Sequence, residues 1–232
     1  GPAERAEGCL GYRGSYAGTG RGKLAEKGRQ MISATEALER LRVGNSRFVS
    51  GGQLMGSFAN PKRRSELKFG QEPFAIILGC SDSRVPAEIV FDFSLGHLFV
   101  IRVAGNIVAP SQIGSIEFAA EQFGTRLVVV MGHADCGAVL ATINELKRPT
   151  ESRSPNLSAI VDRIRPAVEP LMAAETGETA LLNQAVRANI HASVNHLRQG
   201  SNILENQISN EGLQIVGAEY SLVSGAVEFL DV

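Results

Sequence analysis

The stretch Phe74-Ala-Ile-Ile-Leu-Gly79 decides the fold, because it is a short apolar run with no polar residue alternating within it. Similar runs follow at Leu98 to Ala104 and at Leu127 to Gly132. A strand that is apolar on both faces is buried on both faces, which is typical of a parallel sheet covered by helices. The sequence therefore predicts an α/β fold with a central, mainly parallel β-sheet flanked by helices.

Helical patterns alternate with these strands and continue after them. Ser33 and Glu36 form a Ser-x-x-Glu capping box ahead of Leu38 and Leu41, which predicts a helix that begins at Ser33. Near the other end of the chain, two alternating segments flank Ser224-Gly225 and predict a hairpin, a C-terminal strand extension. The further helices are expected at 86–92, 113–123, 138–146, 157–175, 178–199 and 203–210, and the hairpin strands at 213–220 and 226–230.

The first thirty residues differ from the rest in composition. They are rich in Gly, Arg and Ala and show no apolar periodicity, so we expect residues 1–30 to be a flexible extension, either a tag or the remnant of a targeting segment. Residues 31–232 are expected to form a single domain, which is a size that a single hydrophobic core can stabilise without disulfides.

Charge and apolar run length exclude two classes of partner. The net charge is −1, from 23 basic and 24 acidic residues, and neither sign forms a long run, so the electrostatic footprint of a nucleic-acid-binding protein is missing. The longest apolar runs are far shorter than a membrane span. We expect a small-molecule substrate and no nucleic-acid or membrane partner. The extension has no clear apolar signal region, which favours a cytoplasmic protein over a periplasmic or organellar one.

Two of the three cysteines directly follow predicted strands. Cys80 comes after the first strand, and His133 and Cys136 come after the third, whereas Cys9 lies in the extension. Loops at the carboxyl ends of parallel strands meet at one edge of a sheet, where ligands bind. Taken singly, a buried cysteine is more often part of the core than a ligand. Here two thiolates and one imidazole suit zinc, and a set of three ligands leaves a fourth position open, as catalytic zinc sites do.

Asp82 and Arg84 lie beside the first of these cysteines. Two residues apart in an extended loop, they can pair through a bidentate contact between guanidinium and carboxylate. A plain structural ion pair is the simpler interpretation. Next to a metal site, however, Asp82 could itself be a fourth ligand, and Arg84 could withdraw it to free that position for water. This would give a closed and an open state of the metal.

Three motifs together resemble one family. Cys-Ser-Asp-Ser-Arg-Val-Pro at 80–86, Arg-Val-Ala-Gly-Asn at 102–106 and Gly-His-Ala-Asp-Cys-Gly at 132–137 closely resemble the β-class carbonic anhydrases, and the likeness runs from about Ser33 to Leu230. The resemblance implies a parallel sheet core with an N-terminal helical arm wrapped on a partner, in a homodimer or a higher homo-oligomer.

The resemblance also implies the reaction and the residues that perform it. The reaction is reversible hydration of carbon dioxide to bicarbonate and a proton, by hydroxide on one zinc ion per chain, oriented by an Asp-Arg dyad. By this likeness Cys80, His133 and Cys136 are the zinc ligands, and Asp82 and Arg84 are the catalytic dyad, with Asp82 as the fourth ligand in a closed state. The implied substrate-binding residues are Gln71, Phe99, Phe118 and Gly137.

Two alternative functions share these features. The same fold and ligand set resemble relatives that hydrolyse carbonyl sulfide or carbon disulfide. A noncatalytic zinc protein, with a structural or regulatory site, is the alternative from another class. The Asp82-Arg84 pair and the missing fourth Cys or His ligand argue against that second alternative.

Overall fold

A computed structural model of the protein describes residues 32–53, 61–149, 154–173 and 177–230. The predictions for residues 1–30, Cys9 included, fall outside the described residues. The boundary of a single domain at residue 31 therefore stays a prediction.

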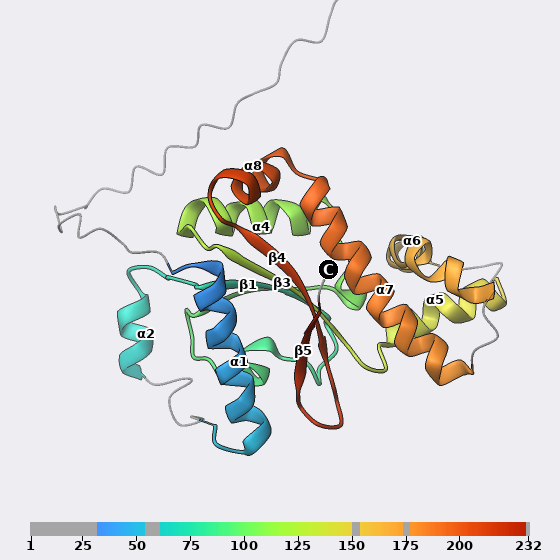
Figure 1. The fold of residues 1–232 in the computed structure, drawn as a ribbon, viewed down its shortest axis with the longest axis horizontal. Helices are drawn as coiled ribbons and strands as arrows, with labels where there is room; N and C mark the ends of the chain where they lie inside the picture. The colour runs from blue at the N-terminus through green and yellow to red at the C-terminus, as the bar shows by residue number, and fades with distance from the viewer. Residues whose placement is uncertain (1–31, 54–60, 150–153, 174–176, 231–232) are drawn as a thin grey trace, which may run out of the picture. The chain divides into compact units, whose positions relative to one another are not determined.

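The core is a five-stranded sheet with the strand order β2-β1-β3-β4-β5 (Figure 1). The strands are β1 (Ala75–Gly79), β2 (Leu98–Arg102), β3 (Leu127–His133), β4 (Gln214–Tyr220) and β5 (Val227–Leu230). The first four pair in parallel, and β5 pairs antiparallel with β4. The predicted α/β class, the mainly parallel sheet and the C-terminal hairpin are therefore confirmed.

Helices cover both faces of the sheet (Figure 1). Their bounds are α1 (Ala34–Ser50), α2 (Pro61–Leu67), α3 (Ala87–Val90), α4 (Pro110–Phe123), α5 (Gly137–Lys147), α6 (Pro155–Val168), α7 (Glu178–Gln199) and α8 (Asn202–Asn210), with short 3-10 turns η2 (Ala104–Asn106) and η3 (Glu169–Ala173). The predicted start of α4 is three residues late, because Pro110 occupies the first turn, where a proline needs no hydrogen-bond partner. Helix α2 was not predicted, because none of its residues is buried.

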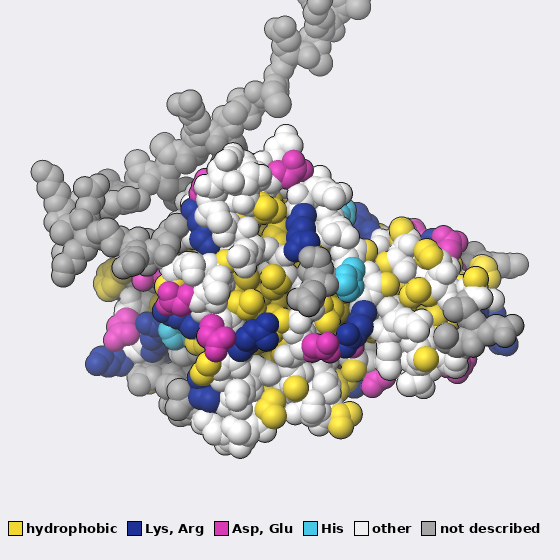
Figure 2. Space-filling model, in the orientation of Figure 1, with side chains coloured by type: hydrophobic (Ala, Val, Ile, Leu, Met, Phe, Trp, Pro, Cys, Tyr) yellow, Lys and Arg dark blue, Asp and Glu magenta, His cyan; other side chains and the backbone are white. Residues whose placement is uncertain are grey.

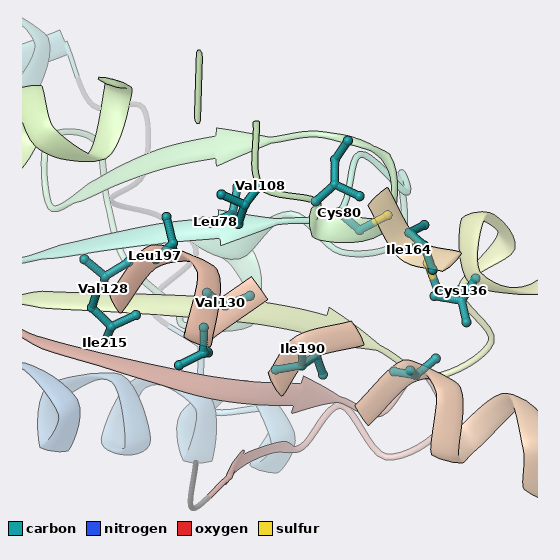
Figure 3. Packing of buried hydrophobic residues seen from close by; sticks show 14 of the residues in the cluster. Leu78, Cys80, Val108, Val128, Val130, Cys136, Ile164, Ile190, Leu197 and Ile215 are labelled. Carbon is teal, nitrogen blue, oxygen red and sulfur yellow. The ribbon is translucent and has the colours of Figure 1, made fainter. Parts of the chain in front are cut away.

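The parallel strands send alternate side chains to two separate apolar clusters. Ile76 and Leu78 of β1 join the cluster under α4, α6, α7 and α8, whereas Ile77 joins the cluster under α1 and α3. Figure 3 shows part of the first cluster, in which Ile190 of α7 lies close to β3. Every residue of β1 and β3 is buried, which explains why apolar and polar residues do not alternate in these strands.

Polar contacts cap helix α1 and bind it to neighbouring elements. Ser33 caps it by accepting a hydrogen bond from the Glu36 amide at 3.1 Å, so the predicted helix start is confirmed. Farther along, the buried Asn45 side chain donates to the carbonyl oxygens of Val90 and Gly225, at 3.0 and 2.9 Å. These bonds join α1 to α3 and to the β4–β5 hairpin.

The surface carries both signs of charge side by side, as Figure 2 shows for one face. This agrees with the net charge of −1. Among the residues that the structure describes, no helix combines the length and the apolar character that crossing a membrane requires.

Candidate metal centre

Three buried donor side chains meet at the carboxyl edge of the sheet. Cys80 follows β1, His133 ends β3, and Cys136 directly precedes α5. Their ligand atoms all lie within 4.8 Å of one another, and the side chains are 4%, 0% and 1% exposed. Figure 3 shows Cys80 and Cys136 at this edge, with Ile164 of α6 close by. The parallel register of β1 and β3 produces this meeting, because it brings the ends of both strands to the same side.

The imidazole of His133 is oriented as a metal ligand would be. Its Nδ1 lies 2.8 Å from the Ala134 carbonyl oxygen, which can only accept, so Nδ1 carries the proton and Nε2 keeps a lone pair. Nε2 is fully buried and has no hydrogen-bond partner among the described residues. A buried nitrogen without a partner is costly in a protein interior, and a metal ion at the three donors would satisfy it. The residues present therefore fit zinc.

The two thiols share a hydrogen bond. Their mutual hydrogen bond lowers the pKa of Cys80 to about 4 and raises the pKa of Cys136. Burial opposes the protonation of His133, but the Cys80 thiolate beside it favours protonation, and the net effect raises the pKa of His133. A divalent metal would replace the protons on these groups, so its binding releases protons.

Asp82 and Arg84 form the bidentate pair that their spacing suggested. Arg84 Nε donates to Asp82 Oδ1 at 2.9 Å and Nη2 donates to Oδ2 at 2.7 Å, while the Arg84 amide also donates to Oδ1 at 2.9 Å. The hydrogen bonds from Arg84 hold the pKa of the Asp82 carboxyl well below its usual range. Asp82 Oδ2 lies 3.9 Å from His133 Nε2, so the carboxylate borders the three donors while Arg84 engages it.

Two further groups, the Arg102 side chain and the Gly105 amide, support the Cys80 loop. Arg102 donates from Nε to the Cys80 carbonyl oxygen at 3.0 Å and from Nη2 to the Asp82 carbonyl oxygen at 2.6 Å. The Gly105 amide donates to Cys80 Sγ at 3.4 Å. Both residues belong to the motif at 102–106, which was the available signal, but the motif alone did not say which atoms they contact.

Of the four predicted substrate-binding residues, only Gly137 lies at this edge. It opens α5 directly after Cys136, and a Cβ built on it would meet no atom within 4 Å, so the backbone there faces open space. Gln71 is exposed and precedes β1, at the opposite end of the strand from Cys80.

Phe99 and Phe118 lie together, but not beside the three donors. Their ring centroids are 6.4 Å apart, and Phe118 is 52% exposed. Phe99 pairs with Ile76 in the sheet, whereas Arg102 pairs with Gly79 next to Cys80. Three residues of strand, or about 10 Å, therefore separate Phe99 from the edge that carries the donors.

Comparison with known proteins gives consistent matches. Residues 75–227 match a family described as carbonic anhydrase. The chain is 36% identical over 192 residues to the carbonic anhydrase of Mycolicibacterium smegmatis. This alignment covers 83% of this chain and 91% of that protein. It is also 36% identical over 198 residues to carbonic anhydrase 2 of Mycobacterium tuberculosis, which covers 84% of this chain and 92% of that protein.

The fold has solved counterparts as well. One of two tetrameric β-carbonic anhydrases from the ascomycete Sordaria macrospora superimposes with a TM-score of 0.64 at 25% identity, over 75% of this chain and 88% of that chain.

Proposed function

The chain belongs to the β-carbonic anhydrase family, and from that premise we propose that it hydrates carbon dioxide reversibly at a zinc ion held by Cys80, His133 and Cys136. One observation carries the proposal: three buried donors lie within 4.8 Å of one another, and one of them is an imidazole nitrogen with no other partner among the described residues.

Zinc bound to these donors supplies a Lewis acid that makes water a nucleophile near neutral pH. Two thiolates would neutralise both charges of the ion, so zinc held here would be a weaker Lewis acid than zinc held by neutral imidazoles. Within the described residues only three Cys, His, Asp or Glu side chains form the cluster, which leaves room for a fourth ligand. The protein must therefore compensate for the weaker Lewis acidity with its own groups.

Asp82 supplies this compensation in our proposal. As a carboxylate it only accepts hydrogen bonds, and it borders the donors at 3.9 Å from His133 Nε2. It would accept the hydrogen of the reacting water and so direct the oxygen lone pair at carbon dioxide. Arg84 holds the carboxylate ionised and oriented. If Arg84 released it, Asp82 could turn to the metal as a fourth ligand and close the site.

The substrate pocket requires a second copy of the chain in this account. Gln71, Phe99 and Phe118 lie away from the donors of their own chain, and Phe118 leaves half of an aromatic side chain exposed. A homodimer or higher homo-oligomer in which this aromatic edge meets the donors of a partner would form one dry pocket for carbon dioxide. The tetrameric state of the Sordaria macrospora enzymes supports such an assembly. Gly137 would offer its amide to bicarbonate from the same chain.

Stopped-flow measurement of carbon dioxide hydration tests the proposal. We expect fast turnover by the zinc-loaded protein, loss of turnover after metal removal with a chelator, and recovery on adding zinc. Carbonyl sulfide and carbon disulfide are measured in parallel, and preferential turnover of either would identify a hydrolase instead. Bound zinc without turnover of any of the three substrates would identify a noncatalytic zinc protein. The names of the two mycobacterial relatives, both carbonic anhydrases, favour the first outcome.

A further inference from the structure

We propose that Asn189 and Ser193 of α7 are positioning residues for the metal site, because they hold the turn at 104–106 so that the Gly105 amide donates to Cys80 Sγ. The inference rests on the proposed role of Cys80 as a zinc ligand. It adds a set of residues that touch neither the metal donors nor the reacting atoms, and that lie more than eighty positions away from the turn in the sequence.

Two hydrogen bonds join α7 to the turn. Asn189 Nδ2 donates to the Gly105 carbonyl oxygen at 2.8 Å, and Ser193 Oγ donates to the Asn106 carbonyl oxygen at 3.1 Å. Four residues apart on one helix, the two side chains share a face, and they are only 2% and 5% exposed. The two buried side chains therefore hold the backbone of the turn at two successive residues, Gly105 and Asn106.

The turn needs such support because Asn106, which is not a glycine, takes a left-handed backbone conformation there. Gly105 has φ +69° and Asn106 has φ +43°, both in the left-handed region. A Cβ on Gly105 would lie 2.7 Å from Ile164 Cδ1 and 3.2 Å from Ala138 Cβ, so α6 and α5 also pack closely against the turn. The turn is therefore held between three helices, and α7 provides the polar contacts.

The same helix also touches the strand that carries His133. A Cβ on Gly132 would lie 2.6 Å from Ile190 Cδ1, so α7 approaches the β3 backbone closely at the residue before the imidazole. Asn189 and Ile190 are neighbours, which means that one turn of α7 sets both the Gly105 carbonyl and the end of β3. Helix α7 thus acts as a platform for two of the three donors.

The hydrogen bond from the Gly105 amide changes the electronic properties of the Cys80 sulfur. A hydrogen bond from an amide to a metal-bound thiolate withdraws electron density from the sulfur and reduces the charge that it donates. In a zinc site with two thiolates, this hydrogen bond would restore part of the Lewis acidity that the reaction needs. The Gly105 amide lies 3.4 Å from Cys80 Sγ, and it keeps that place only while the 104–106 turn is fixed.

Cobalt substitution tests the proposal through a property of the sulfur itself. The near-ultraviolet thiolate-to-cobalt charge-transfer band is measured in the full-length cobalt protein for the wild type, Asn189→Leu and Ser193→Ala. Loss of the amide hydrogen bond raises the energy of the sulfur electrons, so we expect the band to move to longer wavelength, more in Asn189→Leu than in Ser193→Ala. We also expect the zinc dissociation constant to rise about 10- to 100-fold in Asn189→Leu, as outer-sphere substitutions do.

Thr125→Val is the matched control. Thr125 Oγ1 also donates to a backbone carbonyl, that of Pro73 at 2.7 Å, and its side chain is 3% exposed, but it lies at the amino end of β3. This variant loses a comparable buried hydrogen bond and should leave the band in place. If Asn189→Leu does not fold, the milder Ser193→Ala decides.

Two outcomes would overturn the inference, and they are distinguishable. Folded variants whose bands and zinc affinities equal those of the wild type would refute the positioning role alone. A wild-type protein that binds neither cobalt nor zinc would refute the proposed metal site, and the positioning role with it.

Discussion

The exchange Asp82→Asn alters the proposed catalytic dyad at one atom. Oδ1 of Asp82 accepts two hydrogen bonds, from the Arg84 amide and from Nε, so the amide oxygen of asparagine would take this place. The NH₂ group would then replace Oδ2, which is the oxygen 3.9 Å from His133 Nε2 and 2.7 Å from Arg84 Nη2. The group that borders the metal donors would become a hydrogen-bond donor and would lose its partner on Arg84.

The size of the effect follows from the task of that oxygen. Positioned acceptors of a proton or hydrogen contribute about 10²- to 10⁴-fold to turnover. Because Asp82 orients the reacting water more than it removes a proton, we expect the lower limit, a fall in kcat/KM of about 10²-fold. The bonds from Arg84 keep the pKa of the Asp82 carboxyl well below its usual range, so it stays ionised from pH 6 to 9. The deficit of the variant should therefore be equal at every pH in this window.

Stopped-flow hydration rates between pH 6 and 9, with zinc content measured on the same samples, provide the assay. Asp162→Asn is the control, because Asp162 is an exposed carboxylate of α6 whose Oδ1 lies 3.7 Å from Arg165 Nη2, and it should leave the rate unchanged. Asp82→Asn activity within twofold of the wild type at full zinc content would refute the reasoning. A deficit that vanishes toward pH 6 would contradict the depressed pKa.

Three further predictions concern the donors and the strand that carries one of them. Cys80→Ser should lose zinc to a chelator that the wild type resists, which metal analysis after dialysis will show; full zinc content would contradict the ligand assignment. In the metal-free reduced protein, absorbance at 240 nm should report a thiolate that forms at a lower pH than an ordinary cysteine does, because the hydrogen bond from Cys136 lowers the pKa of Cys80. A first thiolate that forms only above pH 8 would contradict this effect of Cys136. Gly132→Ala should lower the free energy of unfolding by about 1–3 kcal/mol in urea titrations, because its Cβ would meet Ile190 at 2.6 Å. Gly114→Ala, in a helix with open space around it, should raise it by about 0.5–1 kcal/mol, and equal effects of the two would refute the packing argument.

Much of the fold is predictable from the sequence because the strands are buried on both faces. The uninterrupted apolar runs at β1 and β3 mark such strands, and α7 begins and ends at the predicted residues. Helix α2 has no buried residue, so it leaves no periodicity to detect. The expected helix at 86–92 is only the four-residue α3, since Asp92 takes a left-handed conformation with φ +52° beyond its end.

The metal donors are predictable for a similar reason, since parallel strands bring their following loops to one edge. This rule alone predicts that Cys80, Asp82 and His133 lie close together. The contacts of Asn189 and Ser193 cannot be predicted in this way, because they join side chains to backbone carbonyls that lie 84 and 87 positions away in the sequence. Every residue has a backbone carbonyl with the same chemistry, so the sequence does not indicate which carbonyl accepts the hydrogen bond from a given side chain.

Zinc K-edge X-ray absorption on the purified protein tests the metal site most directly. The proposed donors predict two sulfur neighbours at about 2.3 Å, and one imidazole nitrogen with one further light atom at about 2.0–2.1 Å. The Cys80→Ser protein, reconstituted with excess zinc, should show one sulfur neighbour at most. A spectrum without sulfur neighbours, or with four sulfur or imidazole ligands and no open position, would contradict a catalytic zinc held by Cys80, His133 and Cys136.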